Sequence, residues 1–403
     1  MIESIVLVGG GLAAAWCART LRQEGYEGRL ILVGEEPHLP YDRPPLSKEF
    51  LRGEQPRARL DILPAAFYEQ NHIEVHLGRR ATRLEVPERR LHLDDGTRLT
   101  YDRLLLCTGG SPRRLRLPGA ELEGLHYLRT VDDSQRLAEK LRPGRRAVLI
   151  GTGFIGLELA ASFRKKGLLV VGIDVLPLPL EPILGPEVGR FFADMHRAEG
   201  VELRLGERVE RLEGQGRLQR VVTDRGAYEC DFAVAGIGII PNLDLVQGTP
   251  LETGNGLLVD AFCRTNVPEI FAAGDIANMA HPRLGRRLRV EHWQSAMLQG
   301  AAAARAMLDR GKPYEELPWF WTDQYNVNVQ TIGHVEKPGP VVLRGEPQSR
   351  SFCAFYLEEG RLHMALTCNR PKEQRAARRL IEARIPVTPE QLADESVDLR
   401  TLA

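Results

Sequence analysis

The sequence predicts an α/β protein built from two Rossmann-like dinucleotide-binding domains and a C-terminal α+β domain. Two observations predict the paired domains. A buried apolar run ends in a glycine-rich turn that opens a helix at residue 9, and the same pattern returns at residue 151. A third observation is the change of composition from residue 317, where short alternating runs replace the earlier strand and helix pattern.

The first glycine-rich turn has the pattern G-x-G-x-x-A. Gly9 allows the tight turn, Gly11 lets the backbone approach a pyrophosphate, and Ala14 lets the helix pack close to the strand. The helix N-terminus directs N–H groups and a positive dipole end at the phosphates. After a second strand at 30–33, Glu35 is placed to accept from a ribose hydroxyl. Many glycine-rich turns are ordinary βα turns, but strand, helix and acid together favour a dinucleotide.

The second turn has the full pattern G-x-G-x-x-G at Gly151, Gly153 and Gly156. A second complete unit predicts a second nucleotide, so that one site holds FAD and the other a nicotinamide. Asp174, at the end of the next strand, would accept from a ribose 2′-hydroxyl and would repel a 2′-phosphate. Residues 175–180 contain no arginine to bind that phosphate. NADH is therefore predicted over NADPH.

Composition excludes several classes of protein. The 403 residues exceed one ordinary core, and the 54 basic residues equal the 54 acidic ones, which argues against nucleic-acid binding. No apolar run approaches the roughly 20 residues of a membrane span, and no targeting signal precedes the first strand. The scattered cysteines form no C-x-x-C pair, which argues against a disulfide framework or a metal site and favours the cytoplasm. They are Cys17, Cys107, Cys230, Cys263, Cys353 and Cys368.

The stretch LPYDRPPLSK at 39–48 follows the first dinucleotide unit. Taken by itself it is a proline-rich loop that leads to a helix, which we expect to resume at Lys48. It resembles the ferredoxin-reductase branch of the glutathione-reductase-like flavoproteins, the NADH-dependent FAD reductases that serve aromatic-ring dioxygenases and bacterial P450 systems. The resemblance implies that Arg43 and Lys48 lie beside the flavin.

The resemblance covers the whole chain and implies a division into three domains. The FAD-binding domain is discontinuous, at 1–110 and 240–316. The NAD-binding domain is 111–239, and the C-terminal interface domain is 317–403.

Alternating residues predict two β-meanders, one at 73–106 that leads into a buried strand and one at 201–233. Asp95-Gly96 is the expected hairpin turn of the first one. The C-terminal domain is expected to contain a small antiparallel sheet and two helices, with strands at 327–332, 341–344, 353–357 and 362–366 and helices at 372–383 and 389–393.

Later segments are assigned to the flavin by the resemblance. Thr108 and Gly109 follow a buried strand, where Cys107 replaces the family's usual alanine; a plain turn is the alternative. Arg129 resembles an arginine that contacts FAD, although a surface arginine is an equal alternative. Asp275 would bond the ribityl chain. The assigned set also includes Leu12, Ala13, Ala81, Gly274, Glu291, His292, Trp293 and Trp321.

Two of these assignments keep alternatives open. The segment from Glu291 starts an alanine-rich helix whose N-terminus, by resemblance, points at the flavin pyrimidine; Trp293 itself is either core or a backbone contact. Trp319 and Trp321 share one face of a strand. Trp321 lies either along the flavin or in a domain-interface core.

The nicotinamide set adds Phe154, Ile155 and Gly236. Glu158 is either a solvated acid on the first helical turn or, by resemblance, the partner of Lys48 near the flavin N5. That pair would orient the nicotinamide and respond to the charge of the reduced flavin. Lys48 and Glu158 are therefore the catalytic candidates.

Two nucleotides imply hydride transfer from the nicotinamide C4 to the flavin N5. No C-x-x-C or C-x₄-C pair is present for disulfide reduction, and residues 44–47 lack the cysteine of NADH oxidases and peroxidases of this fold. The electrons are therefore expected to leave singly, to a [2Fe-2S] ferredoxin or a rubredoxin that feeds an oxygenase.

The partner's docking face is expected among three arginine clusters, although each is also explained as a solvated face. They are Arg113-Arg114-Arg116, Arg283-Arg286-Arg287-Arg289 and Arg375-Arg378-Arg379. An apoptosis-inducing-factor-like flavoprotein with a binding or signalling role, an NADH oxidase and a nitrite reductase module are the alternative functions. A monomer and a homodimer both stay open.

Overall fold

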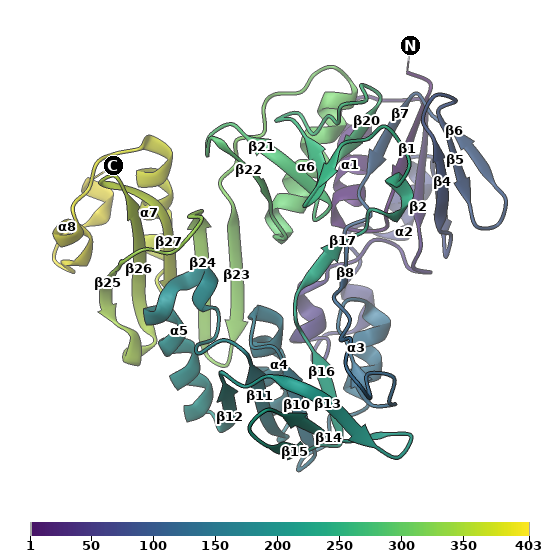
Figure 1. Cartoon of the computed structure of the whole chain (residues 1–403). Coiled ribbons are helices and arrows are strands. Elements are labelled where there is room, and N and C mark those ends of the chain that lie inside the picture. Colours follow the sequence, from purple (N-terminus) through teal and green to yellow (C-terminus); the bar gives the residue numbers. More distant parts are fainter. Residues whose placement is uncertain (1, 403) are drawn as a thin grey trace. The chain divides into compact units, whose positions relative to one another are not determined.

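The computed structural model of the chain describes residues 2–402. Internal contacts divide it into two compact units, each assembled from separate stretches of sequence. Unit 1 comprises Met1–Asp42, Arg57–Ser111 and Ile239–Pro318, and unit 2 comprises Arg43–Pro56, Pro112–Gly238 and Trp319–Ala403. Figure 1 draws the elements of both units, with colours that follow the sequence. The division into three domains stays a prediction.

The centre of unit 1 is a five-stranded parallel sheet with the order β20-β7-β1-β2-β3. Val6 in β1 pairs with Ile31 on one side and with Leu104 on the other. All three side chains are fully buried, as expected for parallel strands covered on both faces. The strands are β1 (Ser4–Val8), β2 (Arg29–Gly34), β3 (Ile73–Leu77), β7 (Arg103–Leu106) and β20 (Ile270–Ala272).

Two helices of unit 1, α1 (Leu12–Gln23) and α6 (Trp293–Met307), pack side by side (Figure 1). Their contact depends on small residues. A Cβ atom on Gly300 would lie 2.3 Å from the carbonyl oxygen of Ala13, so only glycine fits there without a shift. A short helix, α2 (Ala65–Gln70), precedes β3.

The other strands of unit 1 form smaller sheets. A three-stranded antiparallel sheet contains β4 (Ala81–Glu85), β5 (Arg90–Leu93) and β6 (Arg98–Thr100). A four-stranded sheet contains β18 (Thr253–Gly254), β19 (Gly256–Val259), β21 (Ala277–His281) and β22 (Arg286–Arg289). The strands β8 (Gly110–Pro112) and β17 (Ile239–Pro241) form a two-stranded ribbon.

The centre of unit 2 is also a five-stranded parallel sheet, with the order β12-β11-β10-β16-β9. Its strands are β9 (Leu125–His126), β10 (Arg146–Ile150), β11 (Leu169–Asp174), β12 (Val201–Leu205) and β16 (Phe232–Ala235). The connecting helices are α3 (Val131–Ala138), α4 (Phe154–Lys165) and α5 (Glu181–Ala198). The predicted repetition of the dinucleotide fold is confirmed by these two sheets.

Both predicted meanders begin one strand later than expected, and the strands that close the two ranges, β7 and β16, pair in parallel in the central sheets. The prediction was wrong for β3 and β12, which pair in parallel with β2 and β11. The helices α2 and α5 precede these strands and supply the crossover that parallel pairing requires. The second meander is therefore the sheet of β13 (Val209–Gly214), β14 (Leu218–Thr223) and β15 (Ala227–Glu229). The hairpin turn at Asp95-Gly96 is confirmed, with Gly96 at φ 87°.

The C-terminal part of unit 2 contains the predicted antiparallel sheet, with the order β23-β24-β27-β26-β25. Its strands are β23 (Trp319–Gln324), β24 (Val327–Gly333), β25 (Val341–Glu346), β26 (Ser351–Glu358) and β27 (Arg361–Cys368), and its helices are α7 (Pro371–Ala383) and α8 (Pro389–Ala393). The 3₁₀ helices of the chain are η1 (Pro44–Ser47), η2 (Arg57–Arg59), η3 (Asp244–Val246), η4 (Pro347–Ser349) and η5 (Leu399–Thr401). Within residues 2–402, none of the helices has the length and apolarity to cross a membrane.

Candidate nucleotide-binding sites

The glycine turn of unit 1 connects β1 to α1. A Cβ atom on Gly9, whose φ is 136°, would lie 2.1 Å from the carbonyl oxygen of Cys107, so this position requires glycine. A Cβ atom on Gly11 would meet no atom within 4 Å, which leaves open space in front of the helix. Gly11 begins α1 without a side-chain cap, and the first turn contains no acid. The first N–H groups of α1 thus suit a pyrophosphate.

The predicted flavin residues of unit 1 collect at the carboxyl edge of its sheet. Val8 pairs with Val33 and with Leu106, and Leu106 pairs with Ala272, so four strands end at the same level. The residues that follow these strand ends include Gly9, Glu35, Thr108, Gly109, Gly274 and Asp275. This edge of a doubly wound sheet is where such folds bind ligands.

Two residues that the sequence did not single out hold these turns. The Thr108 hydroxyl donates to the carbonyl of Asn242 at 3.0 Å, and the Asn242 amide donates to the carbonyl of Thr108 at 2.8 Å. Buried Gln299 accepts from the Gly274 N–H at 2.9 Å. A glutamine on the buried face of an alanine-rich helix was the available signal for this second contact.

The indole of Trp293 binds Asp42, since its Nε1–H donates to Asp42 Oδ1 at 2.7 Å. Burial raises the pKa of the Asp42 carboxyl, and the bond from Trp293 opposes that rise. The indole N–H is thereby engaged within unit 1. A flavin contact from the N-terminus of α6, where His292 is the N-cap, would come from the backbone.

Three further predicted residues of unit 1 differ in their exposure and in their partners. Glu35 is exposed and lies 3.9 Å from Arg80. Ala81 is half-buried in β4, where it pairs with Leu93. Glu291 pairs with Arg289 at 2.7 Å.

The glycine turn of unit 2 repeats the first one between β10 and α4. A Cβ atom on Gly151 would lie 2.5 Å from the carbonyl oxygen of Gly236, which brings two predicted nicotinamide residues together. A Cβ atom on Gly156 would lie 2.1 Å from the carbonyl oxygen of Gly151. Gly153 faces open space and begins α4 without a side-chain cap. This cradle also suits a pyrophosphate.

Asp174 ends β11 and is fixed against this turn. Its Oδ2 accepts from the N–H of Thr152 at 2.6 Å and from the Thr152 hydroxyl at 2.8 Å. Its Oδ1 accepts from the N–H of Leu176 at 3.0 Å. The carboxylate is thus oriented next to the predicted pyrophosphate turn. Thr152, which is buried, is a supporting residue that the sequence did not reveal.

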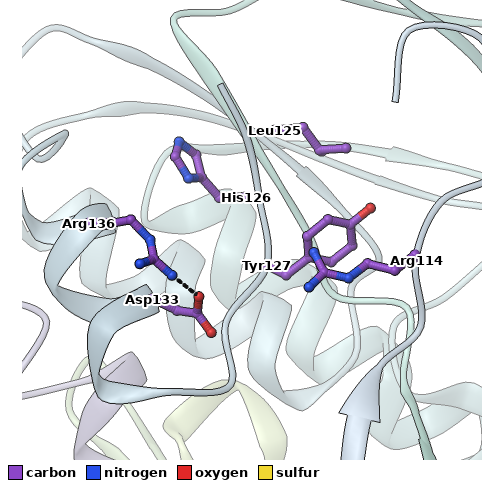
Figure 2. A pocket seen from close by; sticks show the side chains of 6 residues that line it. All are labelled: Arg114, Leu125, His126, Tyr127, Asp133 and Arg136. Atoms are coloured by element: carbon purple, nitrogen blue, oxygen red, sulfur yellow. Dashed lines mark hydrogen bonds and ion pairs between the residues drawn. The ribbon is translucent and has the colours of Figure 1, made fainter. Parts of the chain in front are cut away.

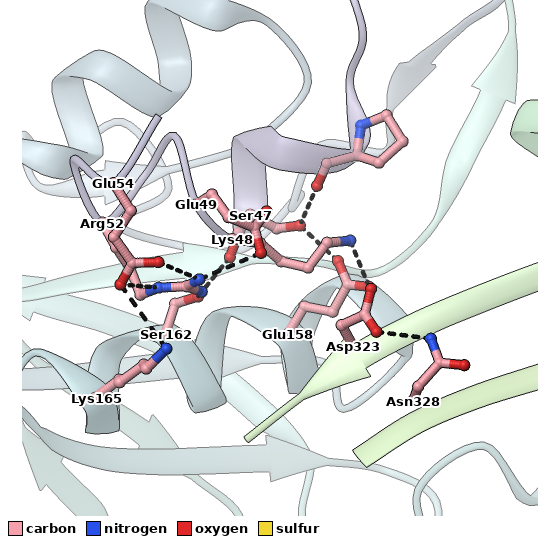
Figure 3. Close-up of polar contacts among 11 residues, drawn as sticks. Ser47, Lys48, Glu49, Arg52, Glu54, Glu158, Ser162, Lys165, Asp323 and Asn328 are labelled. Carbon is pink, nitrogen blue, oxygen red and sulfur yellow. Dashed lines mark hydrogen bonds and ion pairs between the residues drawn. The ribbon is translucent and has the colours of Figure 1, made fainter. Parts of the chain in front are cut away.

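Lys48 and Glu158 form a buried ion pair in unit 2 (Figure 3). Lys48 Nζ lies 3.1 Å from Glu158 Oε1, and the two side chains are only 7% and 5% exposed. Ser47 Oγ donates to Glu158 Oε2 at 2.5 Å, and Thr322 Oγ1 donates to Glu158 Oε1 at 2.7 Å. Glu158 is therefore buried, and the alternative of a solvated acid on the first helical turn is wrong. Burying a charged pair is tolerated because these additional donors satisfy the carboxylate.

The prediction that a helix resumes at Lys48 is wrong. The 3₁₀ helix η1 ends at Ser47, and Lys48 has φ −127° and ψ −111°. The last two carbonyl groups of η1 accept hydrogen bonds from side chains of neighbouring helices. The Ser162 hydroxyl donates to the Ser47 carbonyl at 2.6 Å, and the Ser134 hydroxyl donates to the Leu46 carbonyl at 2.7 Å.

Two predicted flavin arginines of unit 2 lie together. Arg43 Nη1 donates to the carbonyl of Arg129 at 2.6 Å. The Arg129 N–H donates to Asp133, which caps α3 together with Thr130. The backbone around Arg129 is thus held firmly.

The predicted common face of the two tryptophans in β23 is confirmed. The rings of Trp319 and Trp321 stack with centroids 5.1 Å apart. Phe154, the first residue of α4, contacts Phe320 with ring centroids 4.4 Å apart. Ile155 is 45% exposed.

A family model described as pyridine nucleotide-disulphide oxidoreductase matches residues 3–300. The chain belongs to this family. A second model, described as the reductase C-terminal domain, matches residues 319–403.

Several relatives that are named as ferredoxin reductases match this oxidoreductase over nearly its whole length. It is 39% identical to the ferredoxin–NAD(+) reductase component of the anthranilate 1,2-dioxygenase system of Burkholderia cepacia, over 99% of each chain. The structure of the covalent putidaredoxin reductase–putidaredoxin complex matches with a TM-score of 0.96 and 34% identity, over 99% of this chain and 98% of that one. The ferredoxin reductase for the CYP199A2 system of Rhodopseudomonas palustris matches with a TM-score of 0.96 and 36% identity, over 100% of both chains.

These matches confirm the resemblance to ferredoxin reductases and the predicted fold class. They also confirm FAD and NAD(H) as the cofactors of this oxidoreductase. The two open glycine cradles fit that pair of nucleotides. The assignment of single residues to each cofactor stays a prediction.

The thiols of this oxidoreductase do not suit disulphide chemistry. All six cysteines, each within residues 2–402, are free and buried. Burial raises the pKa of Cys107, Cys353 and Cys368 to about 12, so these groups stay thiols at neutral pH. Over the same residues, His, Cys, Asp and Glu form no group of three that could hold a metal ion.

A separate hollow of unit 2 lies at the edge strand β9 (Figure 2). It is lined by Arg114, Leu125, His126, Tyr127, Asp133 and Arg136. The Arg114 guanidinium lies over the Tyr127 ring, 4.1 Å from its centroid, and Arg136 donates to Asp133 at 2.6 Å. Arg114 belongs to a predicted docking cluster, whereas the hollow contains no predicted nucleotide residue.

Proposed function

We propose that this chain is an NADH-dependent ferredoxin reductase that passes electrons from FAD, one at a time, to a ferredoxin serving an oxygenase. The observation that supports this most is the match to ferredoxin reductases over the whole chain, including the reductase C-terminal domain. All six cysteines lie within the described residues 2–402 and are buried, which supports outward transfer over disulphide reduction.

In this proposal each of the two glycine turns binds one cofactor. Gly9, Gly11 and the N-terminus of α1 would hold the FAD pyrophosphate, and Gly151, Gly153 and the N-terminus of α4 would hold that of NADH. When bound, the flavin supplies the two-electron to one-electron conversion. Asp174, already oriented by Thr152, would accept from the ribose 2′-hydroxyl of NADH.

Lys48 and Glu158 are the proposed catalytic pair. Glu158 keeps the Lys48 ammonium fixed in a site that is largely buried from solvent. A fixed positive charge costs no reorganisation when negative charge develops nearby during flavin reduction. The pair would also orient the nicotinamide, as in the resembled family.

A ferredoxin is the proposed partner, because the relatives are named as reductases of ferredoxins. A rubredoxin is the alternative carrier, and either a monomer or a homodimer would serve. Six unpaired cysteines support a cytoplasmic location.

For the docking face we favour two of the three arginine clusters, because arginines of the third bind backbone groups of their own unit. Arg287 Nη1 donates to the carbonyls of Val259 and Asn278, and Arg289 Nη1 donates to that of Asp275. Arg287, although exposed, and Arg289 are therefore held by backbone groups of their own unit. Exposed arginines of the other clusters, at 113–116 and on α7, suit an acidic ferredoxin better.

The experiment is NADH-driven reduction of cytochrome c by the purified protein, with and without a [2Fe-2S] ferredoxin from the same source. We expect strong dependence on the ferredoxin. A rubredoxin in place of the ferredoxin tests the alternative carrier. Rapid NADH consumption without any carrier, with release of peroxide or water, would instead identify an NADH oxidase.

A further inference from the structure

A chain of polar side chains leads from Glu158 into the interior of unit 2. Thr322 Oγ1 donates to Glu158 Oε1 at 2.7 Å, and Gln324 Nε2 donates to Thr322 Oγ1 at 3.1 Å. His196 Nε2 lies 2.8 Å from Gln324 Oε1, and Tyr325 OH lies 2.9 Å from His196 Nδ1. The three middle side chains are 0%, 2% and 0% exposed for Thr322, Gln324 and His196. Four hydrogen bonds thus connect α4, β23 and α5.

The chemistry of the groups gives every bond of this chain one direction. The Glu158 carboxylate, which faces the Lys48 ammonium, only accepts, so the Thr322 hydroxyl must donate to it. The Thr322 oxygen then accepts from the Gln324 amide, which turns the Gln324 carbonyl toward His196. His196 must therefore carry its proton on Nε2, and its Nδ1 accepts from Tyr325. All donors point toward Glu158.

The protonation of His196 and Tyr325 agrees with this direction of the hydrogen bonds. Burial lowers the pKa of His196 to about 4, so the imidazole is neutral at pH 7. Glu199 and Arg350, the charged groups next to it, act on that pKa in opposite senses. Burial raises the pKa of the Tyr325 hydroxyl, which keeps its proton and can donate. The four side chains that lead to Glu158 are therefore neutral, and the series ends at the Lys48–Glu158 ion pair.

A series of hydrogen bonds that all donate in one direction has two physical effects on the group at its end, the Glu158 carboxylate. Consecutive bonds polarise one another, which strengthens the last donor, and that donor fixes the orientation of the carboxylate. The simpler explanation is that the chain only ties α5 and β23 to α4. The two explanations differ in whether Thr322 affects the chemistry through Glu158.

We propose that Thr322, Gln324 and His196 are positioning residues that act through Glu158 and hold its carboxylate turned toward Lys48. This inference rests on the proposed function, in which the Lys48–Glu158 pair serves flavin reduction. None of the three residues is assigned a contact with a nucleotide. Their hydrogen bonds belong to the packing of α4, β23 and α5 around the Lys48–Glu158 pair.

The first test is single-turnover reduction of the bound flavin by NADH in stopped flow. Thr322→Val keeps the shape but removes the donor, and we expect the limiting rate to fall roughly tenfold with the apparent Kd for NADH unchanged. Thr322→Ser restores the hydroxyl and should stay within about twofold of wild type. Thr331→Val, a buried threonine of β24 in the same sheet, is the matched control and should not change the rate.

A double-mutant cycle decides whether Thr322 acts through Glu158. In a Glu158→Gln background, Thr322→Val should cause no further loss, because the carboxylate that it orients is gone. An equal loss in both backgrounds would overturn the proposal. Gln324→Met, which removes both bonds of the amide, provides a second variant with a smaller expected loss if Thr322→Val does not fold.

The second test needs no turnover. Nitrogen-15 NMR of histidine-labelled holoprotein, with the His196 signal assigned by its loss in His196→Gln, should show a neutral imidazole protonated on Nε2 at pH 7. Protonation on Nδ1 would reverse the chain and overturn the inference. If NADH fails to reduce the wild-type flavin, the proposed function is wrong. If it reduces wild type and Thr322→Val at equal rates, only the positioning role is wrong.

Discussion

Glu158 shows how one residue changes meaning between sequence and structure. On the sequence it is an acid in the first turns of a helix, where solvent exposure is common. In the structure its side chain is 5% exposed and accepts from Lys48, Ser47 and Thr322. The partners come from positions more than 100 residues away, so no local pattern could have indicated them. The resemblance alone suggested Lys48, and nothing suggested Thr322.

We expect Glu158→Gln to slow flavin reduction by NADH at least roughly tenfold while FAD stays bound. The substitution keeps the shape but removes the charge that fixes Lys48, an interaction between charged groups. Stopped-flow reduction and the flavin absorbance of the purified variant measure the two effects. Glu54→Gln is the control, since Glu54 is a half-exposed acid that pairs with Arg52 in the same unit. Loss of the flavin from Glu158→Gln would show that the residue serves binding.

His196 is expected to make the protein sensitive to acid. Its pKa is about 4 in the folded protein and about 6.5 in an unfolded chain. The unfolded state therefore binds the proton more tightly, and stability falls as the pH drops from about 6.5 to 4, by about 3 kcal/mol in total. Denaturation series at several pH values measure this loss. In His196→Gln the loss between these pH values should be smaller by that amount; an unchanged pH dependence would contradict the buried neutral imidazole.

Asp174 is expected to set the choice of nicotinamide. Its carboxylate is fixed by Thr152 and Leu176, which leaves its charge in place to repel a 2′-phosphate. Asp174→Asn should reduce the preference for NADH over NADPH roughly tenfold, the worth of one hydrogen bond to a charged group. The ratio of kcat/KM for the two nucleotides measures it. Asp194→Asn is the control and should leave this ratio unchanged, because Asp194 is an exposed residue of α5.

At the scale of elements, the helices α1 and α6 pack closely against each other in unit 1. A Cβ atom on Gly300 would lie 2.3 Å from the Ala13 carbonyl oxygen, and backbone must move to make room. Gly300→Ala should destabilise the protein by about 1–3 kcal/mol, as overpacking does. Thermal unfolding measures the loss. Gly339→Ala, where a Cβ would meet nothing within 4 Å, is the control; equal melting temperatures for both variants would contradict the close approach.

The elements most visible in the sequence were those with strong local patterns. The two strand–glycine–helix units and the C-terminal strands were predicted because apolar runs and tight turns are local features. The strands β3 and β12 were misassigned, because alternation looks the same whether the partner strand is parallel or antiparallel. The helix expected at Lys48 is absent for a similar reason. The Ser47 and Leu46 carbonyls bind α4 and α3, contacts that no sequence window contains.

At the scale of the whole molecule, the sequence predicted the class of reaction by what it contains and what it lacks. Two glycine turns predicted two nucleotides, and the absence of paired cysteines separated this chain from the disulphide reductases of its family. The buried thiols agree with that separation. The partner was less predictable, since arginines that look alike in the sequence differ in their contacts. The Arg287 guanidinium binds backbone carbonyls of its own unit, whereas the Arg114 guanidinium lies over the ring of Tyr127.

The central claim is that electrons enter as a pair from NADH and leave singly to a ferredoxin. The most direct measurement is an anaerobic titration of the NADH-reduced protein with oxidised [2Fe-2S] ferredoxin, followed through the flavin absorbance. We predict full reoxidation of the flavin by two equivalents of ferredoxin per flavin. A flavin that stays reduced until oxygen is admitted would contradict the account.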